Sequence, residues 1–296
     1  MATDLPIPYM QRTRDYYAAL GYPEPYRWVH FGEVPFQPLQ KPLAQCRVAL
    51  VTTAAPCRPG TARRASYDAE AKFHGVYSLD ASRDPDLCIS HVAIDFDHTT
   101  GEDPGTYFPL PELRRAASRG RIGSVAPRFH GAPTNRSHRV TLEVDCPEIV
   151  ERSKADGADA VVLVPNCPVC HQTLSLAARA LEQNGISTVV MGCAKDIVEY
   201  AGVPRFLFSD FPLGNSAGRP NDPASQSFTL ELALDLLERA RGPRTTVQSP
   251  LRWAESAEWK LDYANPARLS REELEKRSRE FAEQKKIAAR VRARTE

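Results

Sequence analysis

The sequence lacks the features that mark membrane, exported and nucleic-acid-binding proteins. No apolar run approaches the roughly 20 residues that cross a bilayer, and nothing near Met1 combines a basic start with an apolar core and a cleavage site. The 38 basic side chains almost balance the 37 acidic ones, which leaves no net charge to attract nucleic acid or an anionic membrane. We therefore expect a cytoplasmic protein whose main partner is a small molecule.

Cysteine is sparse as well. Seven cysteines in 296 residues are an odd number and too few for the disulfide scaffold of a small exported protein, so reduced thiols are expected. Only one Cys-x-x-Cys is present, at Cys167 and Cys170, and no short-period repeat is found. The length suits one large or two modest α/β domains, and we expect no built-in cofactor.

Strand-like and helix-like segments alternate in the second half of the chain. Their order is strand 159–164, helix 171–184, strand 186–191, helix 194–201, strand 205–208 and helix 224–241. Such alternation makes neighbouring strands parallel, so it predicts an α/β fold with doubly wound, mostly parallel sheets. Arg47–Thr53 contains an uninterrupted apolar run, Val48–Val51, and is predicted as a strand buried on both faces.

We expect two Rossmann-like lobes with a crevice between them, flanked by two extensions. The segments are an N-terminal arm at 1–45, a first α/β lobe at 46–145, a second lobe with the cysteine pair at 146–245, and a C-terminal extension at 246–296. In the extension, Ser270 and Glu273 have capping-box spacing ahead of a highly charged helix. Extensions of this kind often embrace a second copy, so we expect a homodimer.

The most informative segment is Asp159–Thr173, where an apolar strand runs into Cys167 and Cys170 and then into a helix. Open α/β sheets bind ligands at the carboxyl ends of their strands, and a helix N-terminus favours a reactive thiolate. Pro168 stiffens the turn, and the spacing brings the sulfurs close enough to bridge. One thiol can attack while the other resolves the adduct, so we predict Cys167 and Cys170 as catalytic residues.

Three other interpretations of the cysteines stay open. Both are inert buried residues in the first, as free cysteines often are. In the second, Cys167, Cys170 and His171 hold a structural zinc ion with Cys193 recruited as the fourth ligand, although no second cysteine pair completes the usual pattern. In the third, Cys57 faces Cys167 across the crevice, and the two thiols abstract and return a proton as in amino-acid racemases.

A cluster of polar residues follows the second predicted strand. His91, Asp95, Asp97 and His98 offer imidazole and carboxylate groups that suit acid–base work or substrate binding, and in principle a divalent metal. The ordinary alternative is a loop in which Asp and His side chains accept hydrogen bonds from the backbone. We favour acid–base or binding roles for His91, Asp95 and His98, and we predict no metal.

A second polar loop contains Asn135, Arg136 and His138. An arginine there suits a substrate with a carboxylate, because guanidinium and carboxylate form two parallel hydrogen bonds. Thr53, at the end of the first long strand, is a further candidate. His171 is a candidate too, since it lies beside Cys170, although neighbouring positions at a helix start do not make its ring face the sulfur.

These segments resemble one known family. From about Arg47 to Glu238 the sequence resembles the selenoprotein B family of the glycine, sarcosine, betaine and D-proline reductases. The resemblance is carried by Val48–Ala54, Ile89–Asp95 with Asp97 and His98, Phe108–Leu113, Arg121–Ala126 and Asp159–Thr173. By this resemblance Cys167 occupies the position of selenocysteine and Cys170 that of the companion cysteine. Position 167 is then either a native cysteine or a recoded selenocysteine written as cysteine.

The resemblance implies reductive cleavage of a carbon–heteroatom bond, with electrons delivered by a dithiol donor, thioredoxin-like or glutathione. Family members also use a separate pyruvoyl-bearing subunit to activate an amine, and nothing in this sequence supplies that group. An easier substrate is therefore expected, with an activated C–S, C–N or C–halogen bond or an electrophilic heteroatom. Its carboxylate would be held by Arg136 or by the start of the helix at 171.

Overall fold

A computed structural model of the chain describes residues 4–56, 75–89, 94–134 and 137–295. The main sheet contains β1 (Arg47–Thr52), β3 (Tyr77–Asp80), β5 (Ser124–Val125), β6 (Arg128–Gly131), β7 (Ala160–Val164), β8 (Ser187–Gly192), β9 (Arg205–Phe208) and β10 (Thr245–Gln248). Its order is β10-β9-β8-β7-β1-β6-β3, and β5 also pairs with β1. Two further strands, β2 (Ala55–Pro56) and β4 (Leu87–Cys88), form a small antiparallel pair.

The predicted α/β class is confirmed. Every pairing in the main sheet is parallel except that of β3 with β6. All residues of β7, β8 and β9 are buried, which explains why these strands carry apolar residues on both faces. In β1, Val48 and Leu50 pack into one hydrophobic cluster and Ala49 and Val51 into another, so the sheet has a core on each side.

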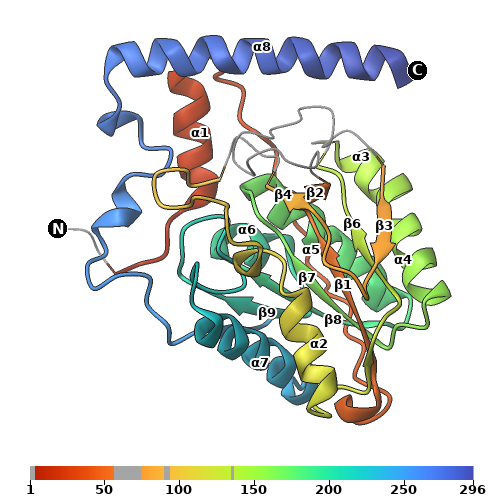
Figure 1. The fold of residues 1–296 in the computed structure, drawn as a ribbon. Helices are drawn as coiled ribbons and strands as arrows, with labels where there is room; N and C mark the ends of the chain where they lie inside the picture. The colour runs from red at the N-terminus through yellow and green to blue at the C-terminus, as the bar shows by residue number, and fades with distance from the viewer. Residues whose placement is uncertain (1–3, 57–74, 90–93, 135–136, 296) are drawn as a thin grey trace.

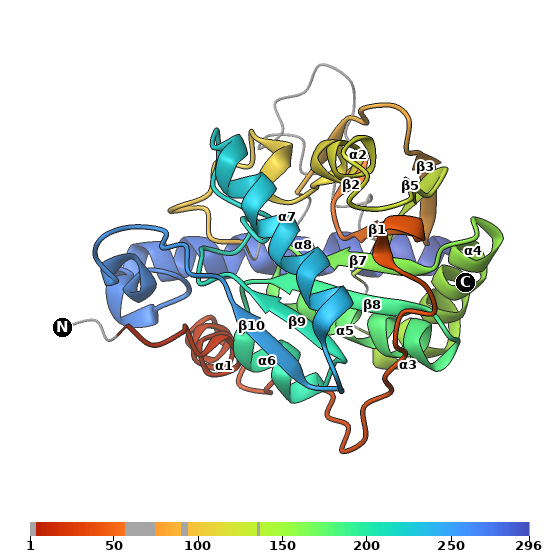
Figure 2. The ribbon, with the colours of Figure 1, turned by 90° about the horizontal axis from the view of Figure 1, so that it is seen from below.

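Helices cover both faces of the sheet (Figures 1 and 2). On one face lie α2 (Leu110–Ser118) and α7 (Pro223–Arg239), and on the other lie α4 (Cys146–Ala155) and α5 (Pro168–Gln183). The short helix α6 (Lys195–Ala201) packs against α5 and against α1 (Tyr9–Ala19) of the N-terminal arm. This arrangement is doubly wound, as expected.

One sheet is found where two lobes, each with its own sheet, are expected. β1 of the predicted first lobe pairs with β7 of the predicted second lobe from Val48↔Ala160 to Thr52↔Val164. The reason is that β1 is buried on both faces and paired on both edges, so it serves both halves of the chain as their central strand. The boundaries of folding units remain predictions, but the sheet is continuous across residues 145 and 146.

The point between β1 and β7 has functional meaning. After β1 the chain continues to β5 and β6 on one side, whereas after β7 it continues to β8, β9 and β10 on the other. Neighbouring strands whose connections diverge in this way form a topological switch point, the place where open α/β sheets bind ligands. Here the switch point lies at the carboxyl ends of β1 and β7, where the two strands end at Thr52 and Val164.

Some elements differ from the sequence-based predictions. The strands β3, β6 and β10 are short or carry polar residues, and their periodicity does not reveal them. The helical segment around α4 begins well before Cys146, because α3 (His138–Val140) continues through a π-helical turn, Thr141–Asp145, into α4. The helix predicted at 171 begins at Pro168, which sits in its first turn.

The two extensions pack on each other. After the short helices η5 (Glu258–Leu261) and η6 (Pro266–Arg268), the chain enters α8 (Arg271–Thr295), which lies across the end of α1 (Figure 1). Phe281 of α8 contacts the rings of Tyr17 and Tyr22, each at 4.9 Å between centroids. The homodimer remains a prediction. The described chain also contains the short helices η1 (Leu43–Gln45) and η3 (Pro104–Thr106).

The predicted capping box opens α8. Ser270 Oγ accepts the Glu273 N–H at 3.2 Å, and Glu273 Oε2 accepts the Ser270 N–H at 3.0 Å. Among the residues that the structure describes, none of the helices combines the length and hydrophobicity needed to cross a bilayer.

Candidate functional site

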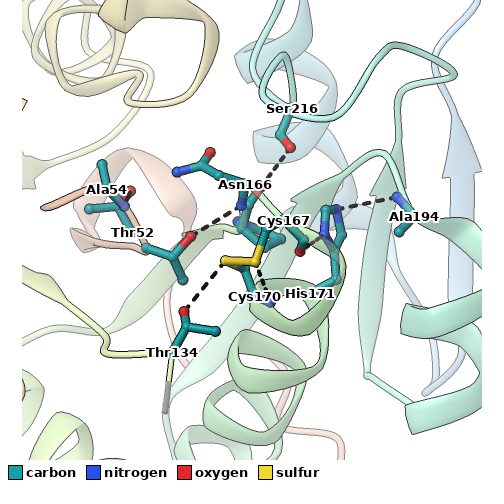
Figure 3. Close-up of a disulfide and its surroundings, with 11 residues drawn as sticks. Thr52, Ala54, Thr134, Asn166, Cys167, Cys170, His171, Ala194 and Ser216 are labelled. Carbon is teal, nitrogen blue, oxygen red and sulfur yellow. Dashed lines mark hydrogen bonds between the residues drawn. A yellow bond between two sulfur atoms is a disulfide. The ribbon is translucent and has the colours of Figure 1, made fainter. Parts of the chain in front are cut away.

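Cys167 and Cys170 lie directly after the carboxyl end of β7. Cys167 is the N-cap of α5, and its sulfur accepts the Cys170 N–H at 3.1 Å. The two sulfurs are joined in a disulfide with their Cα atoms 4.9 Å apart (Figure 3). The side chains are buried, with 3% of Cys167 and none of Cys170 exposed. The pair is therefore held in its oxidised form at the switch point of the sheet.

Polar groups from the ends of three other strands surround the disulfide. Thr134, which follows β6, places its Oγ1 3.4 Å from Cys170 Sγ. Thr53, which follows β1, accepts the Asn166 N–H through Oγ1 at 3.1 Å. Ser216, from the loop after β9, donates to the carbonyl oxygen before Asn166 at 2.7 Å. The sulfurs are thus buried among hydroxyl and amide groups as well as among apolar side chains.

His171 connects α5 to the loop after β8. Its Nδ1 lies 2.7 Å from the Cys167 carbonyl oxygen, and its Nε2 accepts the N–H groups of Cys193 and Ala194 at 2.9 and 3.2 Å. These partners assign the proton to Nδ1 of a neutral ring, and burial lowers the pKa of His171 to about 4. A Cβ at Gly192 would lie 2.7 Å from this ring, so the position requires glycine.

Nε2 of His171 is therefore occupied by two backbone N–H groups, so it does not serve as a proton acceptor for the sulfurs. Cys193 is also separate from the pair, because its Sγ contacts Ser216 Oγ at 3.7 Å and burial raises the pKa of its thiol to about 12. In the described part of the chain no group of three or more His, Cys, Asp or Glu side chains is arranged to hold a metal. With both His171 nitrogens occupied, the zinc interpretation gains no support from this geometry.

The predicted acid–base cluster makes contacts of its own. His98 Nδ1 lies 3.1 Å from both carboxylate oxygens of Asp95, and His98 Nε2 lies 3.4 Å from Asp262 Oδ2. Asp95 is almost completely buried, and this burial raises the pKa of its carboxyl group. Asp97 is exposed. The cluster thus connects the loop after β4 to the C-terminal extension.

His138 lies at the start of α3 and contacts the N-terminal arm. Its Nε2 is 3.3 Å from Tyr26 Oη, which also accepts a hydrogen bond from Gln172 Nε2 at 2.8 Å. Burial lowers the pKa of His138. Because Gln172 belongs to the first turns of α5, His138 is coupled to the helix of the cysteine pair through Tyr26. Four other candidates lie outside the described residues, namely Cys57, His91, Asn135 and Arg136.

A cavity of about 570 Å³ lies elsewhere, between α4 and the second half of α5. Leu142, Cys146, Leu176 and Arg179 are among its lining residues. Its position, toward the other end of α5 from Cys167, separates it from the sulfur chemistry.

Asn166 is the residue of the site to which the sequence assigns no role. Its side chain is completely buried, and neither its Nδ2 nor its Oδ1 has a hydrogen-bond partner among the residues that the structure describes. A signal is present in the sequence, since a carboxamide sits between a fully apolar strand and Cys167. Polarity alone does not show that the group is left unpaired.

Comparisons with known proteins identify two relatives. The chain is 32% identical over 192 residues to D-proline reductase subunit gamma of Acetoanaerobium sticklandii, across 64% of this chain and 77% of that protein. It is 22% identical over 204 residues to glycine reductase complex component B subunit gamma of Peptoclostridium acidaminophilum, across 67% of this chain and 46% of that protein. No family model and no solved structure matches the chain.

Proposed function

The chain belongs to the selenoprotein B family of the glycine and D-proline reductases, and from this we propose a reductase role for its cysteine pair. The proposed reaction is cleavage of an activated carbon–heteroatom bond in a small, carboxylate-bearing molecule. Cys167 is the attacking group and Cys170 the resolving group. The observation that carries the proposal is a disulfide between these two residues at the switch point of the sheet.

The proposed steps conserve electrons and protons. The Cys167 thiolate attacks the substrate R–X, so that an S–R bond forms as the R–X bond breaks and X⁻ leaves. The Cys170 thiolate then attacks Cys167 Sγ, the S–R bond breaks, and the expelled R⁻ takes up a proton. The dithiol loses two electrons and two protons, and the substrate gains them as R–H and H–X. The oxidised product is the Cys167–Cys170 bridge. A dithiol donor of the thioredoxin class, or glutathione, would reduce it again.

The local structure supports this division of roles. The Cys170 N–H points at Cys167 Sγ, and the positive end of the 16-residue helix α5 favours negative charge on that sulfur. Thr134 Oγ1 beside Cys170 Sγ is a hydroxyl that can exchange a proton with the resolving thiol. His171 is fixed as a neutral ring and contributes by holding the helix start in place.

The partners follow from the relatives' names, which describe subunits of D-proline reductase and of a glycine reductase complex. We propose that this chain also works beside other subunits. Selenocysteine at position 167 would use the same geometry, and the codon at that position of the gene decides between the two chalcogens.

The racemase-like alternative depends on Cys57, which lies outside the described residues. It predicts that Cys170 is dispensable, whereas the reductase needs both sulfurs. After turnover, the peptide that contains Cys167 and Cys170 should therefore carry a disulfide if the protein is a reductase and two free thiols if it is a racemase.

A thiol titration tests the proposal. The protein is reduced with dithiothreitol, exposed to carboxylates with an amine, thioether or halide at the α-carbon, alkylated and digested. Loss of two thiols per protein, located by mass to a Cys167–Cys170 bridge and matched by release of the leaving group, supports the reductase. Product release with both thiols still free contradicts it, and stoichiometric zinc on these sulfurs would favour the metal site instead.

A further inference from the structure

Asn166 presents a buried carboxamide that the folded protein leaves unpaired. The side chain has no exposed surface, and in the described part of the chain both of its polar atoms lack hydrogen-bond partners. Burying such a group without partners is costly, because it loses its hydrogen bonds to water. A group of this kind next to a reactive cysteine calls for a physical reason.

The backbone around Asn166 is held firmly, so the unpaired state is not the result of a loose segment. Its own N–H donates to Thr53 Oγ1, the carbonyl before it accepts from Ser216, and the carbonyl after it, that of Cys167, accepts from His171. Three different elements of the fold therefore fix the position of this one residue. The side chain is preorganised, while its hydrogen-bonding capacity stays unused.

The carboxamide also lies on a defined side of the disulfide. Figure 3 shows it turned toward Thr52 and Ala54 at the end of β1, and away from His171 and Ala194. This is the side on which β1 and β7 diverge, where the fold places a ligand. A molecule bound there would contact Asn166 and reach the neighbouring residue Cys167.

A carboxamide has a definite chemical preference. Its Nδ2 donates two hydrogen bonds and its Oδ1 accepts two, so the matching ligand carries an acceptor and a donor close together. An α-amino or α-imino acid has both, because its carboxylate accepts and its ammonium group donates. A neutral amide also recognises such a zwitterion without placing an unpaired charge in the interior.

We propose that Asn166 is the substrate-recognition residue of the dithiol site and binds the carboxylate and ammonium groups of a small α-amino or α-imino acid. This rests on the proposed function only in taking that ligand as the substrate of the reductase. The role is one of positioning, because Asn166 would place the carbon–heteroatom bond next to Cys167 Sγ and take no part in bond cleavage.

The test compares Asn166→Leu with the wild-type protein in binding and in stability. D-Proline is the probe, with pyrrolidine, which lacks the carboxylate, and cyclopentanecarboxylate, which lacks the amine, as matched analogues. Calorimetric titration of the oxidised protein is expected to show D-proline binding about tenfold to a hundredfold weaker in the variant. Each analogue is expected to bind the wild-type protein more weakly than D-proline does.

The melting temperature of the ligand-free protein is an independent measurement, and here the variant should be no worse than the wild type. Replacing an unpaired buried carboxamide by an apolar side chain of similar size should leave the melting temperature unchanged or raise it. Ser153→Ala is the matched control, because Ser153 Oγ is also buried and unpaired but belongs to α4. It should affect stability in the same direction and leave D-proline binding unchanged. Asn166→Ala serves as a second variant if leucine does not fit.

Two results overturn the assignment. One is an equal response of wild-type and Asn166 variants to D-proline, absence of binding in both included. The other is a lowered melting temperature in both Asn166 variants with Ser153→Ala unaffected, which would show that the carboxamide already has partners in the free protein. Because binding is measured with the bridge closed, Asn166-dependent binding to a protein with no reductase activity would contradict the proposed function and leave this assignment intact.

Discussion

Two groups of polar residues near the carboxyl edge of the sheet differ in how fully they are paired. The dithiol site consists of Thr53, Thr134, Asn166, Cys167, Cys170 and His171, and the ionic cluster consists of Asp95, His98, Asp210, Lys260 and Asp262. In the ionic cluster, His98 lies between Asp95 and Asp262, and Lys260 binds Asp210 at 2.5 Å and the Leu5 carbonyl oxygen at 3.2 Å. In the dithiol site, neutral groups surround the sulfurs, and the Asn166 carboxamide has no hydrogen-bond partner within the described ranges.

Under the proposed function, the difference separates residues that hold the fold from residues that would bind a ligand. Lys260 and Asp262 of the C-terminal extension contact Asp210 and His98 of distant segments, so these contacts fasten the extension onto the sheet. Such pairs are complete without a ligand. An unpaired group fixed by its neighbours, in contrast, lowers stability unless a ligand completes it. Substitutions in the two regions should therefore affect different properties.

The largest expected effect is on turnover, from Cys170→Ser. Removing the resolving thiol should lower multiple-turnover activity at least about a hundredfold, because the adduct on Cys167 is no longer expelled. Cys193→Ser is the matched control, since that thiol is buried, has its pKa raised to about 12 and lies outside the pair. Steady-state rates with a dithiol donor, together with the intact mass of the trapped adduct, measure the outcome. Full turnover in Cys170→Ser would favour the racemase-like alternative.

The next effect is on stability, from Lys260→Met in the ionic cluster. Lys260 is only 6% exposed, and its loss leaves the Asp210 carboxylate largely buried without its cation. We expect the free energy of unfolding, measured by urea titration, to fall by about 3 kcal/mol. The rate of thiol exchange at Cys167 and Cys170, measured without urea on the folded variant, should be unchanged. Arg139→Ala, which removes an exposed pair with Glu143, should cost at most about 0.5 kcal/mol. A variant as stable as the wild type would disprove the fastening role.

The sequence predicts the dithiol site better than the ionic cluster for a physical reason. The positions of Cys167 and Cys170 follow from one strand, one turn and one helix that are neighbours along the chain. The partners of His98 and Lys260 are set by how the C-terminal extension folds back, which local patterns do not contain. In both regions the role of a polar side chain depends on its hydrogen-bond or ion-pair partners. The partners of the Asn166 carboxamide are known only once every neighbouring element is in place.

The same reasoning applies to the fold. The apolar runs of β1, β7 and β8 predict buried parallel strands because each run is a local property. The pairing of β7 with β1 joins the two predicted lobes into one sheet, and no local sequence pattern encodes that pairing. Similarly, His171 is visible as a residue beside Cys170, whereas its role depends on the N–H groups of Cys193 and Ala194 in another loop.

A third prediction uses pH to probe the bridge made by His171. Burial lowers the pKa of the folded ring to about 4, whereas the unfolded ring keeps a value near 6.5. Between these values the unfolded state binds more protons, so stability is complete above about pH 6.5 and falls as the pH drops toward 4. The loss from this residue is about 3 kcal/mol.

Urea titrations between pH 7.5 and pH 4.5 measure this dependence in the wild type and in His171→Gln. His130, whose pKa burial also lowers to about 4, is present in both proteins and cancels in the difference. The variant should be less stable at pH 7.5 and should lose less stability as the pH falls. Parallel curves for the two proteins would show that the His171 ring is not held neutral.

The smallest expected effect concerns Asp196, which resembles the ionic cluster in joining distant segments but is held by backbone N–H groups. Its Oδ2 accepts the Met10 N–H of α1 at 2.8 Å, and burial raises the pKa of its carboxyl group to about 6. The raised value means that this group favours the folded state below about pH 4 and that the advantage is lost as the pH rises through 6. Asp196→Asn keeps an acceptor for Met10 without the charge. It should raise the free energy of unfolding at pH 8 by about 1 kcal/mol, less than the pKa difference alone implies because the side chain is partly exposed, and should have no effect at pH 4. A loss of stability at pH 8 would instead show that the negative charge stabilises the start of α1, and would place Asp196 with the residues that hold the fold through charge.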